Sequence, residues 1–422
     1  MVLAGETTPG RLDGRLSGVA GHPENVVGIA LGHVEKCIDG ARAAGRPGPA
    51  AQPVPRAERP TIVSMTSRRL GLTAALTVAP IAAWRFAQAY RARAGYPHRH
   101  PNEHDPGFLG LPFETVAVPT VGGAQLPAWW IPARGGAAGP AVLLVHGWES
   151  ARDRTLPNAQ ILHAVGFHVL TLDVRGHGAN PPEELPLTAG EFGADALAGV
   201  RALLARAEVT GVAVLGHSMG GIGALLAAAA EPRVGAVIAA STPADPYRLT
   251  RQTFRLAHLP IPGPLAYPLA WLTTHVFLTP RGHTVESVSA ARAIETYRGP
   301  VLLVHGDADR VVPFSHLARL ERAAMRGREK DPDAAPVEIL AIPGGEHSWL
   351  YEFAAYRGTI ARFLTTAFGG PMAPDEAETT ARAVPATRPP QREHRYSAIE
   401  AEPGGFRTLW RAIRMAGGGS AR

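Results

Sequence analysis

The sequence predicts an α/β protein with a mostly parallel central sheet and helices on both of its faces. Three observations indicate this class. From about residue 113 to residue 368, short apolar runs alternate with longer helix-like runs. The short runs are rich in Val and Leu without regular polar alternation, which is typical of strands buried on both faces. Finally, 45% of the 422 residues are hydrophobic, which is enough for a sizeable core.

Each expected element follows from its residues, in chain order. Glu114–Pro119 and Gln125–Ile131 are joined by V-G-G-A without a helix, so we expect an antiparallel hairpin at the edge of the sheet. Strand-like and helix-like runs alternate after this hairpin. The expected strands are Ala141–Val145, Phe167–Asp173, Val212–Leu215, Val234–Ala239, Val301–Val304 and Val337–Ile342, and the expected helices are Ala159–Val165, Asp195–Ala207, Ile222–Ala230, Ser315–Met325 and Leu350–Thr366.

Composition divides the chain into four segments. Residues 1–64 end in a proline-rich run and are expected to form a disordered N-terminal extension. Residues 65–106 hold an apolar helix, which resembles a membrane anchor, and a basic linker. Residues 107–369 form the α/β domain. Residues 370–422 are rich in Ala, Pro, Arg and Glu, and we expect them to be mostly disordered, apart from a short helix at Phe406–Met415.

The apolar stretch Leu70–Trp84 has fifteen residues, fewer than the roughly 20 that a membrane-spanning helix needs. Three interpretations are open: the apolar region of a signal peptide, a short membrane anchor, or a helix packed on the folded domain. Met65, just before this stretch, is an alternative to Met1 as the start of translation. If the stretch spans a membrane, the excess of arginine after it predicts a cytoplasmic domain. The expected location is therefore cytoplasmic, or membrane-associated on the cytoplasmic side.

The charge and the residue types exclude several classes of partner. The net charge is +6, but residues 107–369 carry only −1, so the surplus lies in the flanking segments and not on a nucleic-acid-binding face. Cys37 is the only cysteine, which excludes an internal disulfide and a thiolate metal cluster. The sequence has no metal-ligand cluster, phosphate-binding loop or dinucleotide-binding loop. We therefore expect neither cofactor nor metal.

One interval breaks the alternation of strands and helices. About sixty residues separate the strand that ends near Ala240 from the strand that starts at Val301, far more than an ordinary crossover needs. This interval is apolar and rich in proline. We expect a helical lid at about residues 242–295, over the carboxyl ends of the strands, where open sheets bind ligands. The alternative is a second interface or a membrane-contact patch.

The stretch V-L-G-H-S-M-G-G-I-G, from Val214 to Gly223, places Ser218 between Gly216 and Gly220, where a strand ends and a helix begins. A turn this sharp crowds the chain, so glycine is required two residues to either side. The residue at the apex projects its side chain clear of the sheet. Here that side chain is a hydroxyl.

A serine hydroxyl needs a base, and the base needs a group that orients it. The strand at residues 301–304 is followed by H-G-D-A-D, which offers Asp307 and Asp309. The strand at residues 337–342 is followed by P-G-G-E-H, which offers His347. A serine, an aspartate and a histidine thus follow three strands in this order, and all three are expected at one edge of the sheet.

These motifs resemble those of the α/β-hydrolase superfamily: G-H-S-M-G at the nucleophile, G-D-A-D-R-V-V-P after a late strand and G-G-E-H before the last helix. The resemblance covers about residues 108–367, and the first strands resemble the bacterial serine aminopeptidase-like and esterase-like branch. It implies that Ser218 is the nucleophile, His347 the general base and Asp309 the orienting carboxylate. It also implies an oxyanion hole formed by the backbone N–H groups of Met219 and Trp148.

The motifs and the apolar interval together predict a serine hydrolase that cleaves an ester bond of a hydrophobic small molecule through an acyl-serine intermediate. Acyl thioesterase, perhydrolase and aminopeptidase chemistry are alternatives on the same three residues. An aminopeptidase needs a carboxylate for the free amine of its substrate, for which Glu286 and Glu295 are candidates. An alternative from another class of function is a membrane-tethered module that binds a lipid or other ligand and has only weak catalytic activity.

Overall fold

The computed structural model describes residues 63–386 and 388, except residues 258 and 332. The expected disorder of residues 1–62 and 389–422, and the helix expected at Phe406–Met415, lie outside the described residues. Among the described residues, those from Met65 onward belong to one structural unit.

A sheet of eight strands has the order β1-β2-β4-β3-β5-β6-β7-β8. β1 and β2 form the predicted antiparallel hairpin, and β2 is also antiparallel to β4. The other neighbouring strands are parallel, which confirms the predicted fold class. The strands are β1 (Glu114–Pro119), β2 (Gln125–Ile131), β3 (Gly139–Val145), β4 (His168–Leu172), β5 (Val209–His217), β6 (Val234–Ala240), β7 (Val301–Gly306) and β8 (Val337–Ile342).

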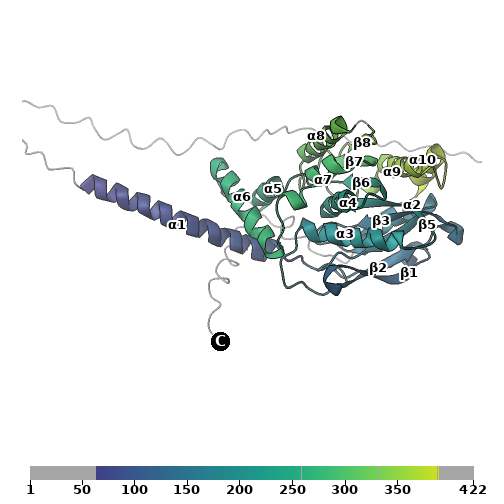
Figure 1. Cartoon of the computed structure of the whole chain (residues 1–422), viewed down its shortest axis with the longest axis horizontal. Coiled ribbons are helices and arrows are strands. Elements are labelled where there is room, and N and C mark those ends of the chain that lie inside the picture. Colours follow the sequence, from purple (N-terminus) through teal and green to yellow (C-terminus); the bar gives the residue numbers. More distant parts are fainter. Residues whose placement is uncertain (1–62, 258, 332, 387, 389–422) are drawn as a thin grey trace, which may run out of the picture. The chain divides into compact units, whose positions relative to one another are not determined.

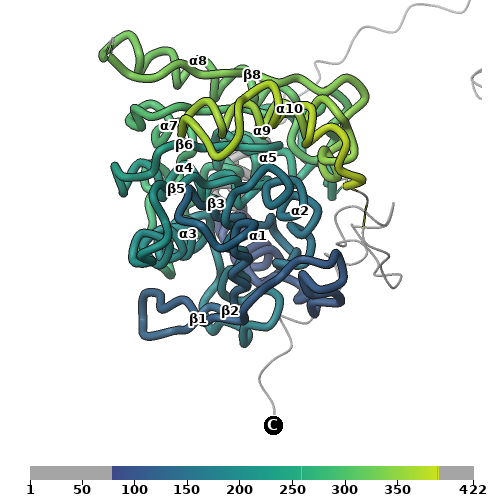
Figure 2. The backbone as a smooth tube through the Cα atoms, turned by 90° about the vertical axis from the view of Figure 1, so that its right-hand side faces the viewer, coloured from purple at the N-terminus to yellow at the C-terminus, as the bar shows by residue number. Residues whose placement is uncertain are grey.

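Helices cover both faces of the sheet. In Figure 2 the strands run from β1 and β2 at the bottom to β8 at the top, with α3, α4 and α7 on the left and α2, α9 and α10 on the right. The helices are α1 (Val63–Ala94), α2 (Leu156–Ala164), α3 (Ala189–Leu204), α4 (Met219–Ala230), α5 (Pro246–Leu256), α6 (Gly263–Leu278), α7 (Ala290–Thr296), α8 (Ser315–Lys330), α9 (Ala354–Phe368) and α10 (Pro374–Ala383).

Alternate residues of the central strands face two separate cores. In β3, Leu143 and Val145 pack in the core beneath α3, α4 and α8, whereas Val142 and Leu144 pack in the core beneath α2 and α9. Successive side chains of a strand point to opposite faces, so a strand covered on both sides has to be apolar throughout. This is why the strands read as unbroken apolar runs.

The long interval between β6 and β7 is helical and contributes α5, α6 and α7. The C-terminal part of α1 packs against this insertion: the Phe86 and Tyr90 rings lie 5.5 and 5.7 Å from the Phe254 ring of α5, and the Tyr90 hydroxyl lies 2.6 Å from that of Thr253. α1, α5 and α6 therefore lie together at one end of the domain (Figure 1). Within the described residues, no helix is both long and apolar enough to cross a membrane.

The prediction of a mostly disordered tail from residue 370 is wrong for its first part. Residues Pro374–Ala383 form α10, which packs against α9 through the buried side chains of Ala377 and Ala381. Gly358 of α9 allows this close approach, because a Cβ there would lie 2.7 Å from Nε of Arg382. Two alanines one turn apart give a helix a narrow apolar face, which an argument from composition alone does not detect.

Candidate active site

Ser218 joins β5 to α4 in the sharp turn that the sequence predicts. Its backbone has φ 54° and ψ −118°, a strained conformation for a residue other than glycine. A Cβ at Gly216 would lie 2.1 Å from the carbonyl oxygen of Gly220, and one at Gly220 would lie 2.2 Å from that of Val145. Glycine is therefore required on both sides of the serine.

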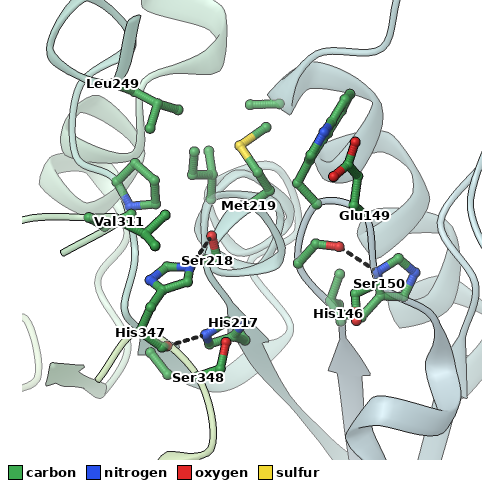
Figure 3. A pocket seen from close by; sticks show the side chains of 18 of the residues that line it. His146, Glu149, Ser150, His217, Ser218, Met219, Leu249, Val311, His347 and Ser348 are labelled. Atoms are coloured by element: carbon green, nitrogen blue, oxygen red, sulfur yellow. Dashed lines mark hydrogen bonds between the residues drawn. The ribbon is translucent and has the colours of Figure 1, made fainter. Parts of the chain in front are cut away.

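The structure brings Ser218, His347 and Asp309 into one chain of hydrogen bonds. His347 follows β8 and lies with Nε2 3.1 Å from the Ser218 hydroxyl (Figure 3) and with Nδ1 2.8 Å from Oδ2 of Asp309. An ionised carboxylate only accepts, so Nδ1 carries the proton and Nε2 accepts the serine hydroxyl. Asp307 is not part of this chain: it is exposed and accepts the backbone N–H of Gly344 at 2.7 Å.

Asp309 is buried but well supplied with hydrogen-bond donors. Its Oδ1 accepts the backbone N–H groups of Val311 and Val312 at 2.9 and 2.8 Å. His305 Nε2 lies 3.3 Å from Oδ2. Burial alone would raise the pKa of the Asp309 carboxyl, but the bonds from His305, His347 and Val312 outweigh it and hold that pKa well below its ordinary value. The carboxylate therefore stays ionised beside His347.

Two further histidines organise this arrangement, and the sequence did not assign them. His217 Nε2 donates to the backbone carbonyl of His347 at 2.7 Å, which ties the base to the turn that carries the serine (Figure 3). Burial lowers the pKa of His217 to about 4, so the ring is neutral at pH 7. His305 donates to the carbonyl of Val312 at 2.8 Å and fixes the loop around Asp309. The only signal in the sequence is their position: His217 is the last residue of β5 and His305 is the second-last residue of β7.

Met219 and Trp148 line the same cavity as Ser218. Met219 is the first residue of α4, where an N–H has no partner within the helix. In the part of the chain that the structure describes, neither amide donates to a protein acceptor. Gly147 brings the Trp148 loop close to the serine, because a Cβ on it would lie 3.2 Å from the Cβ of Ser218.

Ser218 and His347 line a cavity of about 350 Å³. Most of its wall is apolar, and the helical insertion supplies a large part of it. The contributing side chains include Tyr90 of α1, Leu249 and Leu256 of α5, and Phe277 and Leu278 of α6. The site therefore suits a substrate with a hydrophobic part of small-molecule size.

The two glutamates that the sequence analysis named as candidates to bind a substrate amine lie away from the cavity. Neither Glu286 nor Glu295 is among the described residues that line the cavity. Glu295 is paired with Lys330 at 2.5 Å and with Arg326. Glu149 does line the cavity, with a left-handed φ of 50°, and one of its oxygens accepts the backbone N–H of His98 at 3.1 Å.

Comparison with known proteins identifies the family and the fold. The alpha/beta hydrolase family matches residues 142–357, just over half of the chain. An uncharacterized protein of Mycobacterium tuberculosis is 30% identical over 257 residues, which cover 59% of this chain and 78% of that protein. The sn-1-specific diacylglycerol lipase ABHD11 of Xenopus tropicalis is 35% identical over 101 residues, 24% of this chain and 30% of that protein. An esterase of Pyrococcus furiosus has the same fold, with a TM-score of 0.52, 20% sequence identity and coverage of 66% of this chain and 98% of that chain. This chain belongs to the alpha/beta hydrolase family.

Proposed function

We propose that this hydrolase cleaves an ester bond of a hydrophobic small molecule through an acyl-serine intermediate. The observation that carries the proposal is the chain of hydrogen bonds from Ser218 through His347 to Asp309 at the wall of an apolar cavity. A hydroxyl, an imidazole and a carboxylate in this order are the groups that nucleophilic acyl transfer needs.

In the acylation step, Oγ of Ser218 attacks the ester carbonyl carbon while its proton passes to Nε2 of His347. The C–O bond to the alcohol then breaks, and His347 returns the proton to the leaving alkoxide. Water repeats the sequence on the acyl-serine: His347 takes its proton, the new C–O bond forms, and the acid leaves as Ser218 recovers its proton. Asp309 keeps Nδ1 protonated and stabilises the imidazolium in both steps.

The oxygen that becomes negative in each step needs hydrogen-bond donors. We assign the amides of Met219 and Trp148 to it, which donate to no backbone acceptor among the described residues. Each such donor contributes roughly 10²–10³ in rate in comparable enzymes. Because both donors are backbone groups, only a change of loop geometry removes them.

The apolar cavity wall favours an ester with a hydrophobic acyl or alcohol group. Each additional methylene buried there is worth about 0.8 kcal/mol, or about fourfold in kcat/KM, until the cavity is filled. One relative, matched over 30% of its length, is a diacylglycerol lipase, which acts on an ester of this kind.

The test is the hydrolysis of p-nitrophenyl esters from acetate to palmitate by the full chain. We expect kcat/KM to rise with acyl length from acetate and then level off or fall. Ser218→Ala should abolish turnover and labelling by a fluorophosphonate, whereas Ser150→Ala is the matched control, since Ser150 also lines the cavity but is not bonded to His347. Turnover that survives in Ser218→Ala would exclude the proposed nucleophile.

Hydrolysis of an amide or a thioester is the alternative on the same three residues. Among the described residues that line the cavity, one carboxylate could bind the free amine of an aminopeptidase substrate. Glu149 lines the cavity and would have to hold the amine of an aminopeptidase substrate. Hydrolysis of amino-acid p-nitroanilides that exceeds ester hydrolysis, and that is lost in Glu149→Gln, would favour this alternative. If folded protein hydrolyses none of these substrates, the ligand-binding module becomes the better interpretation.

A further inference from the structure

We infer that the exposed side chains of α6 and of the middle part of α1 bind the surface of an anionic phospholipid bilayer. We call these side chains the cap surface. It consists of the exposed apolar side chains of Leu265, Tyr267 and Trp271 on α6 and of Val78, Ile81 and Trp84 on α1, together with the exposed arginines Arg85 of α1 and Arg255 of α5. The inference concerns binding, so it does not depend on which bond the enzyme cleaves.

Exposed apolar side chains are concentrated on these two helices. Thirteen large hydrophobic residues are exposed within the described part of the chain, and six of them belong to α1 and α6. Tyr267 and Trp271 are one turn apart on the same face of α6, and Trp271 is 55% exposed. Isolated exposed apolar residues are ordinary, but a group that includes two tryptophans and a tyrosine marks an interaction surface. Trp and Tyr are the residues that favour the boundary between lipid and water.

The segments that carry these helices are rich in arginine. Residues 78–100 and residues 246–282 each contain four arginines and no Asp or Glu. Removing the four arginines of the second segment from the net charge of −1 on residues 107–369 leaves −5 on the rest of that domain. Arg281 is paired with Glu183 and contributes little, but Arg85 and Arg255 are exposed. The two segments that carry the cap surface are thus basic, whereas the remainder of residues 107–369 has a net negative charge.

A bilayer fits this combination better than a protein or a nucleic acid does. Apolar and aromatic side chains beside arginines are the composition of helices that lie in the interface of anionic membranes. A nucleic acid would use the arginines but not the exposed leucine, isoleucine and valine. The domain's net negative charge away from these helices would also orient it, with the cap surface toward the lipid.

The cap surface and the cavity use the same helices. Tyr90 of α1, Leu249 of α5 and Phe277 of α6 line the cavity, while the outer faces of α1 and α6 carry the cap surface. The rings of Tyr90 and Phe277 lie 6.2 Å apart, so α1 and α6 meet near their C-terminal ends (Figure 1). Binding through this surface would bring the cavity next to a hydrophobic substrate dissolved in the bilayer.

Co-sedimentation of the full chain with vesicles tests the inference. We expect strong binding to vesicles of phosphatidylcholine with 30% phosphatidylglycerol (about a third of the lipid, enough for a negative surface potential), weak binding to pure phosphatidylcholine, and weaker binding at high salt. The double variant Leu265→Glu with Trp271→Glu should lower the partition coefficient by at least about tenfold. Neither residue lines the cavity, so hydrolysis of a soluble ester should not change.

Val121→Glu with Met325→Glu is the matched control. Val121 and Met325 are 60% and 51% exposed and lie outside α1, α5 and α6, so this variant makes the same change of charge on another surface. It should bind vesicles within about twofold of the wild type. The inference is overturned if the full chain binds no anionic vesicles, if the Leu265/Trp271 variant binds as the wild type does, or if the control loses binding equally. Failure of all ester assays with vesicle binding intact would instead contradict only the proposed function.

Discussion

Replacing Asp309 by Asn tests the proposed base and its partner with little disturbance of the fold. Oδ1 of Asp309 accepts the amides of Val311 and Val312, and the amide oxygen of asparagine can keep both bonds. The NH₂ group then faces Nδ1 of His347, where the carboxylate oxygen was 2.8 Å away. Two donors cannot face each other, so His347 has to adopt the other tautomer.

The expected loss of activity follows from that tautomer of His347. With Nδ1 accepting from asparagine, Nε2 carries the proton and no longer accepts the hydroxyl of Ser218, which lies 3.1 Å away. The imidazolium also loses the neighbouring negative charge. By analogy with serine proteases, we expect kcat/KM to fall by about 10⁴ with KM little changed. The assay is hydrolysis of p-nitrophenyl butyrate, together with a thermal melt to show that the variant is folded.

Asp307→Asn is the control for this experiment. Asp307 is two residues away, is exposed, and accepts only the N–H of Gly344 among the contacts described here. Its substitution should change kcat/KM by less than about threefold, since one exposed hydrogen bond contributes little. The reasoning fails if Asp309→Asn retains more than about a tenth of wild-type activity while folded, or if Asp307→Asn is the variant that loses activity.

Two further predictions concern the buried histidines. His217→Phe removes the bond to the carbonyl of His347, and we expect kcat to fall by about three- to tenfold with KM within twofold; an equal loss in kcat and gain in KM would instead indicate a general distortion. Burial lowers the folded-state pKa of His217 and His316 to about 4 and of His177 to about 3, below the ordinary value of 6.5. These neutral rings stabilise the fold above pH 6.5 and lose that contribution as pH falls toward 4. Urea unfolding at pH 7, 5.5 and 4.5 should show a steadily smaller free energy of unfolding, and a constant value would contradict this.

The elements of the fold could be predicted from the sequence because their causes are local. Runs of Val and Leu mark strands that are covered on both faces, and Gly216 and Gly220 mark the turn at Ser218, where any Cβ would collide with backbone. The order of serine, aspartate and histidine after three strands indicated one sheet edge, since parallel strands end on the same side.

Local patterns were insufficient wherever a contact joins distant parts of the chain. His347 lies 129 residues from Ser218 and 38 from Asp309, and only the packed sheet shows that Asp309 faces the histidine while Asp307 faces solvent. The roles of His217 and His305 follow in the same way from carbonyl groups in other loops.

The two ends of the domain also show the difference between what the sequence predicts and what the tertiary structure adds. The sequence left three interpretations of the stretch at residues 70–84, and the structure adds that the following turns of α1 pack on the helical insertion and line the cavity. The structure also shows that part of the tail that was expected to be disordered forms α10. The sequence by itself determined the strands, the turn at Ser218 and the order of the candidate residues, because sterics and burial act on neighbours in the chain. The tertiary structure showed that Asp309, which the family resemblance had implied, is the aspartate that meets the histidine, and it alone decided which helices enclose the cavity, because those contacts depend on how the sheet brings distant segments together.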